Sequence, residues 1–378
     1  MRVLQGRTSA IDGAVAVAEA TQGWADSPEI IFVFCSTAQG PQEVARALSE
    51  RFSGVPIVGC TTSGELLAGE HTNKTMVVAG LVGSGVRWQT TVIRDLRSFD
   101  EEAAVGAAGR LFAGLGTDTE DFDPDAHFCL LFVDGLSMKE EVVSALLADA
   151  IEGVTLAGGS AGDDLAFAKT FVIHEGGAES DAAVVVMGKA ERSSFKIIKH
   201  QHYVTTPRSL VITRADVGAR RVYEMDGYPA AEAYAAAIGV PLEEMTTEQM
   251  FLNPMTFQCN GELYVRSIQT LNDDRSLTFY CGIEEGMVLD IGGHHDMESS
   301  LRDDLGALEG EVGKIDFLLG FNCILRSLEA QEGDTHARLG SIYEGLGASM
   351  IGFDTYGEQL NGLHINQTLV ALAICAAD

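Results

Sequence analysis

Residues 30–60 read IIFVFCSTAQGPQEVARALSERFSGVPIVGC and contain the pattern that decides the fold class. Residues 30–35 form a short apolar run of β-branched and aromatic side chains, as expected of a buried strand. Residues 41–52 begin with proline and place their apolar side chains on one helical face. A second short apolar strand is expected at 56–60. A strand, a helix and a strand in this order predict an α/β layer architecture.

The alternation of strands and helices continues along the chain. Up to residue 192 it predicts strands at 75–81, 88–93, 127–133, 154–157, 171–173 and 183–187, and helices at 102–115 and 142–151, the last opened by a capping box of Ser137 and Glu140. Beyond it, strands are expected at 194–200, 210–213, 222–225, 263–268, 277–281, 287–289, 315–320, 350–354 and 369–375, and helices at 228–237, 296–308 and 335–346. No short repeat and no linker rich in proline or serine is visible. We therefore predict two tightly packed domains, 1–192 and 193–378, each a mixed β-sheet layered with helices, in the α/β (α+β) class.

The composition limits the kind of protein. With 46% hydrophobic and 21% charged residues among 378, the chain is globular rather than disordered. Its formal net charge of −30 argues against a nucleic-acid partner and against an anionic membrane surface. No apolar run reaches the roughly 18 residues of a membrane-spanning helix, and no secretory signal is visible. The seven cysteines include no C-x-x-C pair, so we expect reduced core thiols in a cytoplasmic protein.

Two histidines stand at the end of a predicted strand, in the sequence KHQHY of residues 199–203. Strand alternation places His200 and His202 on one face, where two imidazoles could ligate a transition metal or haem iron. The alternative is an ordinary polar strand end. No H-E-x-x-H or similar metal spacing occurs in the chain.

The most unusual segment lies near the C-terminus, where GFDTYGE at 352–358 is followed by HINQT at 364–368. Polar side chains at strand ends that face one cleft suit a small ligand, which makes Tyr356, Glu358 and Asn366 candidate ligand-binding residues. An ordinary polar loop is the alternative. Arg266 and Arg326 are expected at half-buried strand positions, where a guanidinium needs an anionic partner such as Glu358 or a bound carboxylate.

Two side chains could act as nucleophiles. Cys323 lies close to Arg326 in sequence, so its thiol pKa could be lowered, although an inert core cysteine is the simpler interpretation. Ser137 stands in GLSMK, which begins like the nucleophile elbow of serine hydrolases but lacks its last glycine. No base is recognisable beside either residue. We therefore predict no catalytic residue and count Cys323 with the ligand-binding group.

The order of IVGCTTSGE, VDGLS, LAGGSAGDD, VYEMDGYPAAEAY, YVRSI, FNCILR, GFDTYGEQ and HINQT resembles the FIST signal-transduction proteins. Each motif alone is weak, but the ordered set, above all GFDTYGE with HINQT, is specific. The resemblance covers nearly the whole chain with an N-terminal and a C-terminal FIST domain. It implies an intracellular ligand-sensing module that regulates histidine kinases, cyclic-di-GMP enzymes or chemotaxis receptors. Some stand-alone members are haem proteins that sense nitric oxide.

Three functions follow as expectations. The first is a non-enzymatic cytoplasmic sensor that binds haem without covalent attachment, through His202 or else His200, and regulates a partner histidine kinase or cyclic-di-GMP protein in response to nitric oxide. The second is a haem-free sensor of an amino acid or other small carboxylate, clamped by Arg266 or Arg326 and Glu358. The third is an enzyme using Cys323 or Ser137. The assembly expected is a monomer or a homodimer, without nucleic acid and without membrane insertion.

Overall fold

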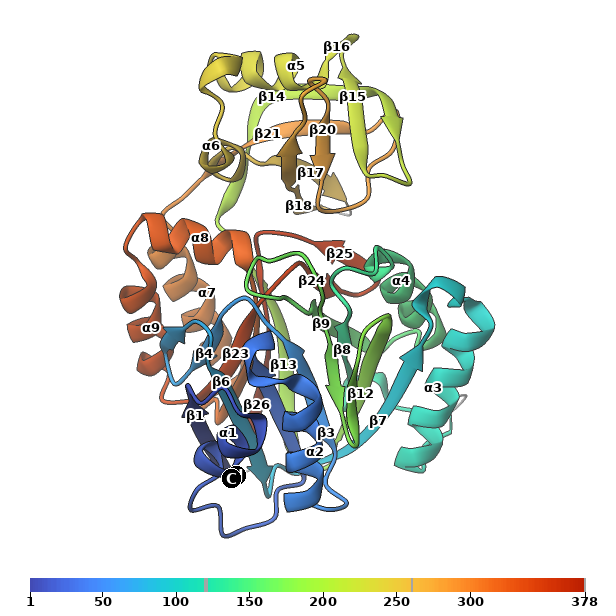
Figure 1. The fold of residues 1–378 in the computed structure, drawn as a ribbon, viewed down its shortest axis with the longest axis vertical. Helices are drawn as coiled ribbons and strands as arrows, with labels where there is room; N and C mark the ends of the chain where they lie inside the picture. Colours follow the sequence, from blue (N-terminus) through green and yellow to red (C-terminus); the bar gives the residue numbers. More distant parts are fainter. Residues whose placement is uncertain (119–121, 260, 377–378) are drawn as a thin grey trace.

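Three of the sheets in this computed structural model, which describes residues 1–118, 122–259 and 261–376, follow one plan. Each is formed mainly by one unit of the chain that contains an edge strand, a helix, a strand, one or two helices, a parallel strand, a short hairpin and a final strand, in that order. We call these units the first, second and third repeats, and together they form the body at the bottom of Figure 1. Residues 203–294 form a smaller unit above the body, the cap.

The repeats correspond element by element. The first contains β1 (Arg2–Thr8), α1 (Gly13–Ala20), β2 (Ile30–Cys35), α2 (Pro41–Arg51), β3 (Ile57–Thr61), β4 (Glu65–Leu67), β5 (Glu70–Thr72) and β6 (Met76–Val82). The second contains β7 (Val86–Arg94), α3 (Glu101–Leu115), β8 (His127–Val133), α4 (Glu140–Ala150), β9 (Thr155–Ser160), β10 (Val172–His174), β11 (Gly177–Glu179) and β12 (Ala182–Ala190). The third contains β13 (Ser193–His200), α7 (Met297–Val312), β22 (Phe317–Cys323), α8 (Ile324–Glu332), α9 (His336–Gly345), β23 (Ser349–Thr355), β24 (Glu358–Leu360), β25 (Leu363–Ile365) and β26 (Leu369–Ala376).

The hairpins are exchanged between repeats. The hairpin β4–β5 of the first repeat pairs with β23 of the third. The hairpin β24–β25 of the third pairs with β9 of the second, and β10–β11 of the second pairs with β3 of the first. Each six-stranded sheet is therefore completed by a neighbour, and the three exchanges close a ring.

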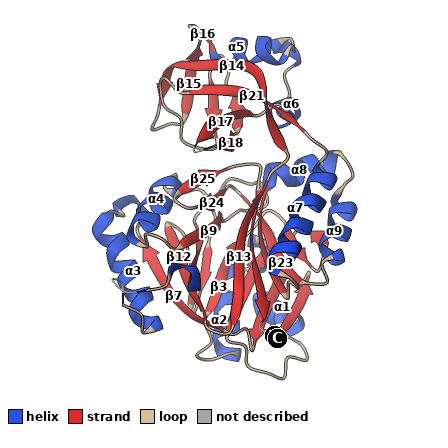
Figure 2. Cartoon of the chain, turned by 180° about the vertical axis from the view of Figure 1, so that it is seen from behind, coloured by secondary structure: helices blue, strands red, loops and turns tan. Residues whose placement is uncertain are grey.

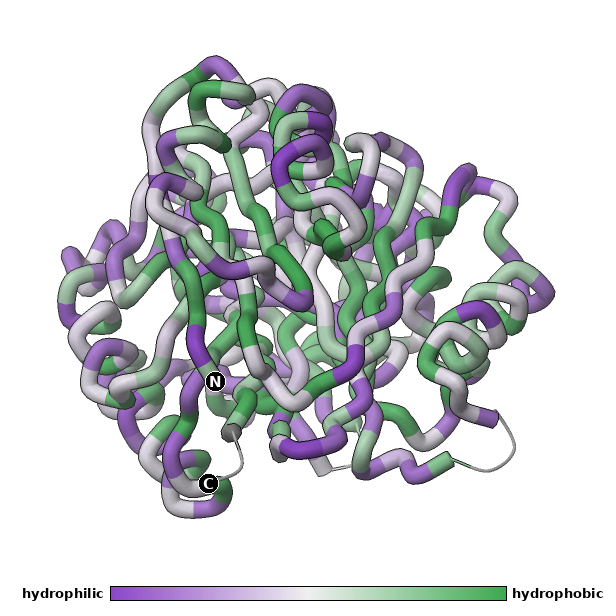
Figure 3. The backbone as a smooth tube through the Cα atoms, turned by 90° about the horizontal axis from the view of Figure 1, so that it is seen from below, coloured by the Kyte–Doolittle hydropathy of each residue, from purple (hydrophilic) through white to green (hydrophobic). Residues whose placement is uncertain are grey.

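The inner faces of the three sheets meet in one central core. Phe34, Phe132 and Phe321 occupy corresponding positions near the ends of β2, β8 and β22, and their rings are neighbours, with centroids 6.0 Å and 5.7 Å apart in successive pairs. Three outer clusters lie between each sheet and its own helices. Figure 3 shows the apolar chain segments gathered inside the body and the polar ones around it. Each buried phenylalanine contributes about 1.5–3 kcal/mol, so the aromatic centre is a main source of stability.

The repeat is also visible in the sequence. Residues 57–78 and 350–371 align without a gap, and ten of these 22 positions are identical. One of them is the pair Gly59 and Gly352, where a Cβ atom would overlap the carbonyl oxygen of the adjacent parallel strand. This repeat was not predicted, because corresponding residues of the two copies lie 293 positions apart.

The cap is inserted between β13 and α7. It contains β14 (Tyr203–Asp216), β15 (Arg221–Met225), β16 (Tyr228–Pro229), α5 (Ala230–Ile238), α6 (Thr247–Leu252), β17 (Met255–Cys259), β18 (Glu262–Arg266), β19 (Ile268–Leu271), β20 (Leu277–Phe279) and β21 (Val288–His294). The first and last strands of its sheet, β18 and β19, are separated by one residue, so the sheet curls around on itself. Figure 2 shows the cap sheet standing over the body with α6 beside the connections.

The predicted fold class, mixed sheets layered with helices, is confirmed. The expected boundary at 192/193 falls in the turn between β12 and β13, between the second and third repeats. None of the helices in the described ranges is long and apolar enough to cross a membrane. The seven cysteines are free thiols, and all except Cys259 are buried.

Three local predictions were wrong. Residues 228–229 form a strand rather than the start of α5. The capping box at Ser137 is absent because Met138 has a φ of 58°, which breaks the helical path, and Ser137 Oγ donates instead to the Asp134 carbonyl. Arg326 lies in the first turn of α8 rather than at a strand position. This helix was not predicted because it follows an apolar run directly.

Candidate functional site

Two hairpin contacts of the body are homologous. We call the contact of β24–β25 with β9 the Glu358 junction and the contact of β4–β5 with β23 the Glu65 junction. Both begin with a buried glutamate that follows a glycine. The Glu358 junction lies under the cap (Figure 1) and contains most of the predicted ligand residues.

Glu358 is held by threonines rather than by an arginine. Its Oε1 accepts a 2.5 Å hydrogen bond from Thr355 Oγ1, and its Oε2 accepts from the Thr368 backbone N–H at 3.1 Å and from Thr368 Oγ1 at 2.7 Å. Burial raises the pKa of Glu358 to about 8. The carboxyl group therefore joins the two ends of the hairpin and is enclosed by protein atoms.

The Glu65 junction repeats this arrangement. Glu65 accepts from Thr62 Oγ1 at 2.5 Å, from the Thr75 backbone N–H at 3.0 Å and from Thr75 Oγ1 at 2.7 Å. Burial raises the pKa of Glu65 to about 7. We call this set of hydrogen bonds from two threonines to a buried glutamate the glutamate bracket. Because it occurs at both junctions, Glu358 has a structural role in the repeat, and the residues around it distinguish one junction from the other.

Tyr356 directs the site toward the cap. Its hydroxyl donates to Asp163 Oδ1 at 2.5 Å, and burial raises the pKa of this phenol. Asp163 in turn accepts from the backbone N–H groups of residues 167–169, which shapes the loop between β9 and β10. That loop places the Phe167 ring on the Tyr356 ring, with centroids 4.9 Å apart and planes 17° from parallel. Phe167 is nevertheless 44% exposed in total, so the stacked pair has one open side.

A cavity of about 90 Å³ lies beside this pair, between body and cap. Its body wall includes Phe167 and Tyr356, and its cap wall includes Phe279 and Tyr280. Cavities at domain interfaces with aromatic walls and a few polar groups are typical of small-ligand sites.

A buried ion pair crosses the same interface. Arg220 of the cap donates from Nη2 to Glu140 Oε2 at 2.9 Å and from Nη1 to the Tyr280 carbonyl at 2.6 Å. Burial raises the pKa of Glu140, and the charge of Arg220 opposes that shift. Glu141, the next residue of α4, accepts from the Gly282 backbone N–H of the cap at 2.7 Å. The first turn of α4 is therefore the main polar contact of the body with the cap.

The return loop of the hairpin makes a second contact. Gln367 donates to the Tyr203 hydroxyl at 2.6 Å and to the Phe251 carbonyl at 2.8 Å, while its Oε1 accepts from Ser267 at 2.8 Å. Thr368, the next residue, binds Glu358. The loop thus connects the Glu358 bracket directly to the cap.

The structure separates the other predicted ligand residues. Arg266 donates from Nη1 to the His364 carbonyl at 2.9 Å and lies over the Phe257 ring, on the cap side of the Glu358 junction. Asn366 is buried, and its Oδ1 has no hydrogen-bond partner among the described residues. Arg326 lies at the Glu65 junction. Cys323 is buried, and burial raises the pKa of its thiol well above the usual value, which disfavours a nucleophilic role.

Comparison with known proteins supports the resemblance seen in the sequence. The model of the FIST N domain matches residues 29–228, and that of the FIST C domain matches residues 230–361. The chain belongs to the FIST family. The two matches divide the chain inside the cap, between β15 and α5.

More distant comparisons add little to the FIST assignment. None of the curated proteins matches the chain. Among solved structures, a chorismatase crystal structure is similar over 99% of this chain and 98% of that chain, with 12% identity and a TM-score of 0.37. A likeness this weak carries no argument about activity.

The two histidines proposed as haem ligands are buried and engaged in this FIST protein. His200 Nδ1 bonds to Asp304 at 2.7 Å, and His202 Nε2 bonds to Glu329 at 2.8 Å. Burial lowers the pKa of His200 to about 4 and also lowers that of His202, so both are neutral. Neither ring lines any of the described cavities.

The nearest large hollow does not suit a porphyrin either. It measures about 580 Å³ and includes Glu329, the partner of His202. Four carboxylates line it, and no lysine or arginine does: Glu248, Asp296, Glu329 and Glu332. Haem propionates would be repelled there. The nitrogens left without a hydrogen-bond partner, His200 Nε2 and His202 Nδ1, are buried and border none of these cavities, so the two rings do not fit axial ligation of haem.

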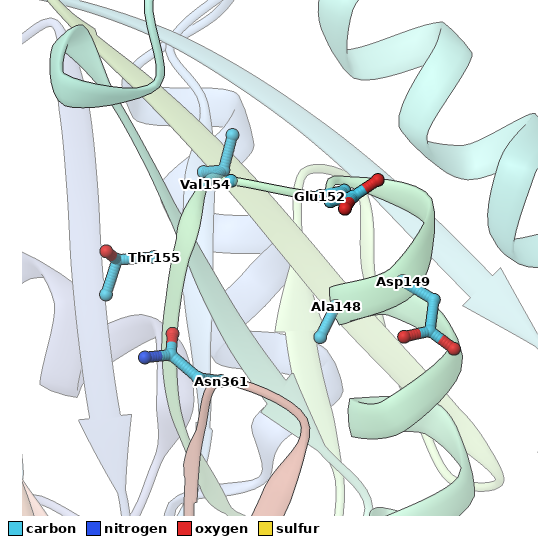
Figure 4. A pocket seen from close by; sticks show the side chains of 7 residues that line it. Ala148, Asp149, Glu152, Val154, Thr155 and Asn361 are labelled. Carbon is cyan, nitrogen blue, oxygen red and sulfur yellow. The ribbon is translucent and has the colours of Figure 1, made fainter.

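Another hollow, of about 560 Å³, lies at the tip of the β24–β25 hairpin (Figure 4). Asn361 anchors this tip, because its Oδ1 accepts from the Leu156 backbone N–H at 3.0 Å. Asp149 and Glu152 from the end of α4 line the opposite side. The lining contains two carboxylates and no cation, and we assign it no ligand.

Sequence reasoning missed the residues that join cap and body. Glu140 and Arg220 are 80 residues apart, and neither stands in an unusual local pattern. Gln367 was visible within HINQT but was overlooked beside Asn366. Gln367 has a positive φ of 56°, and Lys74 and Asp181, at the corresponding positions of the other repeats, also have positive φ. Sequence alone does not show this conformation.

Proposed function

We propose that this FIST protein is a small-ligand sensor whose ligand binds between cap and body, beside Tyr356 and Phe167. One observation carries the proposal. The cavity of about 90 Å³ has walls from two units that are joined by two chain connections and a small set of polar contacts. A ligand there touches both units at once.

The proposed ligand is an amino acid or a similarly small carboxylate. Arg220 and Glu140 form an ion pair at the wall of the cavity. The carboxylate of a bound amino acid can take the place of Glu140 as the partner of Arg220, and its ammonium can take the place of Arg220 as the partner of Glu140. The aromatic walls suit an apolar side chain, and the small volume excludes drug-sized molecules. This places the clamp on Arg220 and Glu140, rather than on Arg266 or Arg326 with Glu358.

The signal would be a change in how the cap sits on the body. A ligand that exchanges partners with Arg220 and Glu140 binds differently to the docked and loosened arrangements, which is the condition for a population shift. Gln367 would transmit the change, because it holds the cap on one side of the peptide chain while Thr368 holds Glu358 on the other. The output proposed is non-enzymatic control of a cytoplasmic histidine kinase or cyclic-di-GMP protein, in keeping with the signal-transduction family.

Thermal unfolding with a panel of amino acids and small carboxylates tests the proposal. We expect one class to raise the unfolding temperature saturably, and Phe167→Ala to weaken that response at least about tenfold by removing one wall. Tyr228→Ala, a matched loss of an exposed cap aromatic away from the cavity, should leave the response intact. Equal weakening by both variants, or no response to any compound, would contradict the proposal.

Haemin titration separates this sensor from a haem protein. We expect no saturable Soret band and no effect of His202→Ala on haemin absorbance, since His202 is enclosed. A stoichiometric band that shifts with nitric oxide and disappears in His202→Ala would replace the proposed function with gas sensing.

A further inference from the structure

The Glu65 junction contains a buried arginine without a counter-ion. Arg326 is 1% exposed, and its Nε donates to Asn322 Oδ1 at 3.0 Å. Its Nη1 and Nη2 have no hydrogen-bond partner, and no carboxylate among the described residues forms an ion pair with it. The charge also acts on Tyr343, but neither nitrogen meets hydrogen-bond geometry with that phenol. A buried charge left this way is costly, so the two nitrogens require an acceptor.

The guanidinium borders a small cavity of about 20 Å³. The polar residues around it come from the first repeat and from α8, α9 and β22 of the third: His71, Asn322, Arg326, Ser327, His336 and Tyr343. A cavity of this size admits one water-sized species. Polyatomic dianions such as sulfate are too large.

The nearby carboxylate is engaged by other side chains. His71 Nε2 bonds to Asp354 Oδ2 at 2.6 Å, and Asn322 Nδ2 donates to Asp354 Oδ1 at 2.7 Å. His336 stacks on His71, with ring centroids 4.1 Å apart. Asp354 therefore makes no hydrogen bond or ion pair with the Arg326 guanidinium, whose Nη1 and Nη2 stay without a protein acceptor among the described residues.

The repeat itself does not require this charge. Arg326 stands four residues after Asn322, the last residue of β22 that pairs with β26. The residues at the corresponding positions of the first and second repeats are Gln39 and Ser137. Both are uncharged, so the fold forms without a cation there.

We propose that the Glu65 junction is a second binding site, separate from the cleft under the cap, which takes one small monovalent anion of halide or nitrate size on Arg326. The anion accepts from Nη1 and Nη2 and compensates the guanidinium. Since the site lies between β5 of the first repeat and α8 and α9 of the third, bound anion stabilises the closure of the ring.

The test is thermal unfolding at constant ionic strength, with gluconate replaced stepwise by chloride, bromide or nitrate. For the wild type we expect a saturable rise of at least about 2 °C at about 100 mM of the small anion. Arg326→Met should abolish the rise. Gln39→Met is the matched control at the corresponding buried position of the first repeat, and it should keep the full response.

Bromide-grown crystals give an independent readout on the wild type, which matters if Arg326→Met fails to fold. We expect one anomalous peak within hydrogen-bond distance of Nη1 and Nη2. The proposal is overturned by a water molecule at that position in bromide crystals, by an equal response of Arg326→Met and wild type, or by a wild type indifferent to the anion.

Discussion

The Glu65 and Glu358 junctions share a histidine as well as a glutamate, yet the two histidines have opposite surroundings. His71 faces Asp354, a carboxylate at the end of β23. His364 occupies the same place in the other hairpin, but its Nδ1 meets the Gln359 amide at 3.0 Å, and Ser160 replaces the carboxylate. Burial and the charges of Arg220 and Arg266 lower the pKa of His364 well below its usual value. One scaffold therefore supports an ionic junction buried inside the body and a neutral one that meets the cap.

The difference shows how a repeat acquires function. The glutamate bracket is kept in both junctions because it closes the hairpin, whereas the groups next to it differ. At the Glu358 junction, the cationic charges come from the cap and pair with α4 of the body. At the Glu65 junction, they come from within the body. Sensing is therefore proposed for the Glu358 junction and ring closure for the Glu65 junction.

The largest expected effect concerns the glycines that precede the two brackets. Gly59→Ala should destabilise the protein by about 4 kcal/mol or more, because the new Cβ overlaps the Val33 carbonyl oxygen on the adjacent strand. Gly352→Ala should cost less, since its contact with the Gly320 carbonyl is looser. Urea unfolding of both variants measures the order. An equal cost would mean that the two junctions tolerate backbone strain alike.

Removal of a buried arginine should separate the junctions most clearly. Arg220→Met leaves Glu140 buried and unpaired and should cost about 3–5 kcal/mol, whereas Arg326→Met leaves no carboxylate behind and should cost little or stabilise the protein. Denaturant unfolding in gluconate, without small anions, measures both. A large loss for Arg326→Met under those conditions would show that the guanidinium has a protein partner.

The glutamate brackets should make stability depend on pH. Because both carboxyl groups have raised pKa values in the folded protein, their favourable contribution is complete below the unfolded pKa of about 4.3 and is lost as pH rises through about 7 for Glu65 and about 8 for Glu358. Each loses roughly 3–5 kcal/mol at most. Unfolding free energies of Glu65→Gln and Glu358→Gln between pH 5 and 9 should each show a shallower decline than wild type, with Glu358→Gln the shallower of the two.

The two histidines should differ by a smaller amount. His71 has a raised pKa, so its ion pair with Asp354 stabilises the protein below the unfolded pKa and loses this effect as pH rises through the folded pKa. His71→Gln should therefore cost about 1–2 kcal/mol more at pH 6 than at pH 8.5. His364→Gln should show a smaller difference of the opposite sign, because the unfolded chain binds a proton below its pKa of about 6.5 that the folded, neutral His364 does not bind. Histidine NMR titration provides the direct comparison.

Local patterns were enough to predict most strands and helices of the body. Residues 30–35 and 127–133 match β2 and β8 in full because a continuous apolar run between polar turns has few alternatives. The hairpins β4–β5 and β24–β25 were missed, and of β10–β11 only the first strand was predicted, at 171–173, since three-residue strands show no periodicity. Tyr356, Glu358 and Asn366 were singled out by their unusual polar pattern, and their role in ligand binding stays a prediction. Arg220 and Glu140 were not, because their meaning depends on a contact that chain neighbours do not reveal.

The exchanged hairpins have a consequence for synthesis of the chain. The sheet of the third repeat needs β4 and β5, which leave the ribosome long before the other strands of that sheet, and the sheet of the second needs β24 and β25, which leave it long after β9. The outer edge of β9, which ends at Ser160, therefore stays open for pairing until β24, which begins at Glu358, has been made. A high contact order of this kind predicts slow, late folding. A nascent chain stopped before residue 349 would present β9 as an unpaired edge, open to aggregation or to capture by a chaperone.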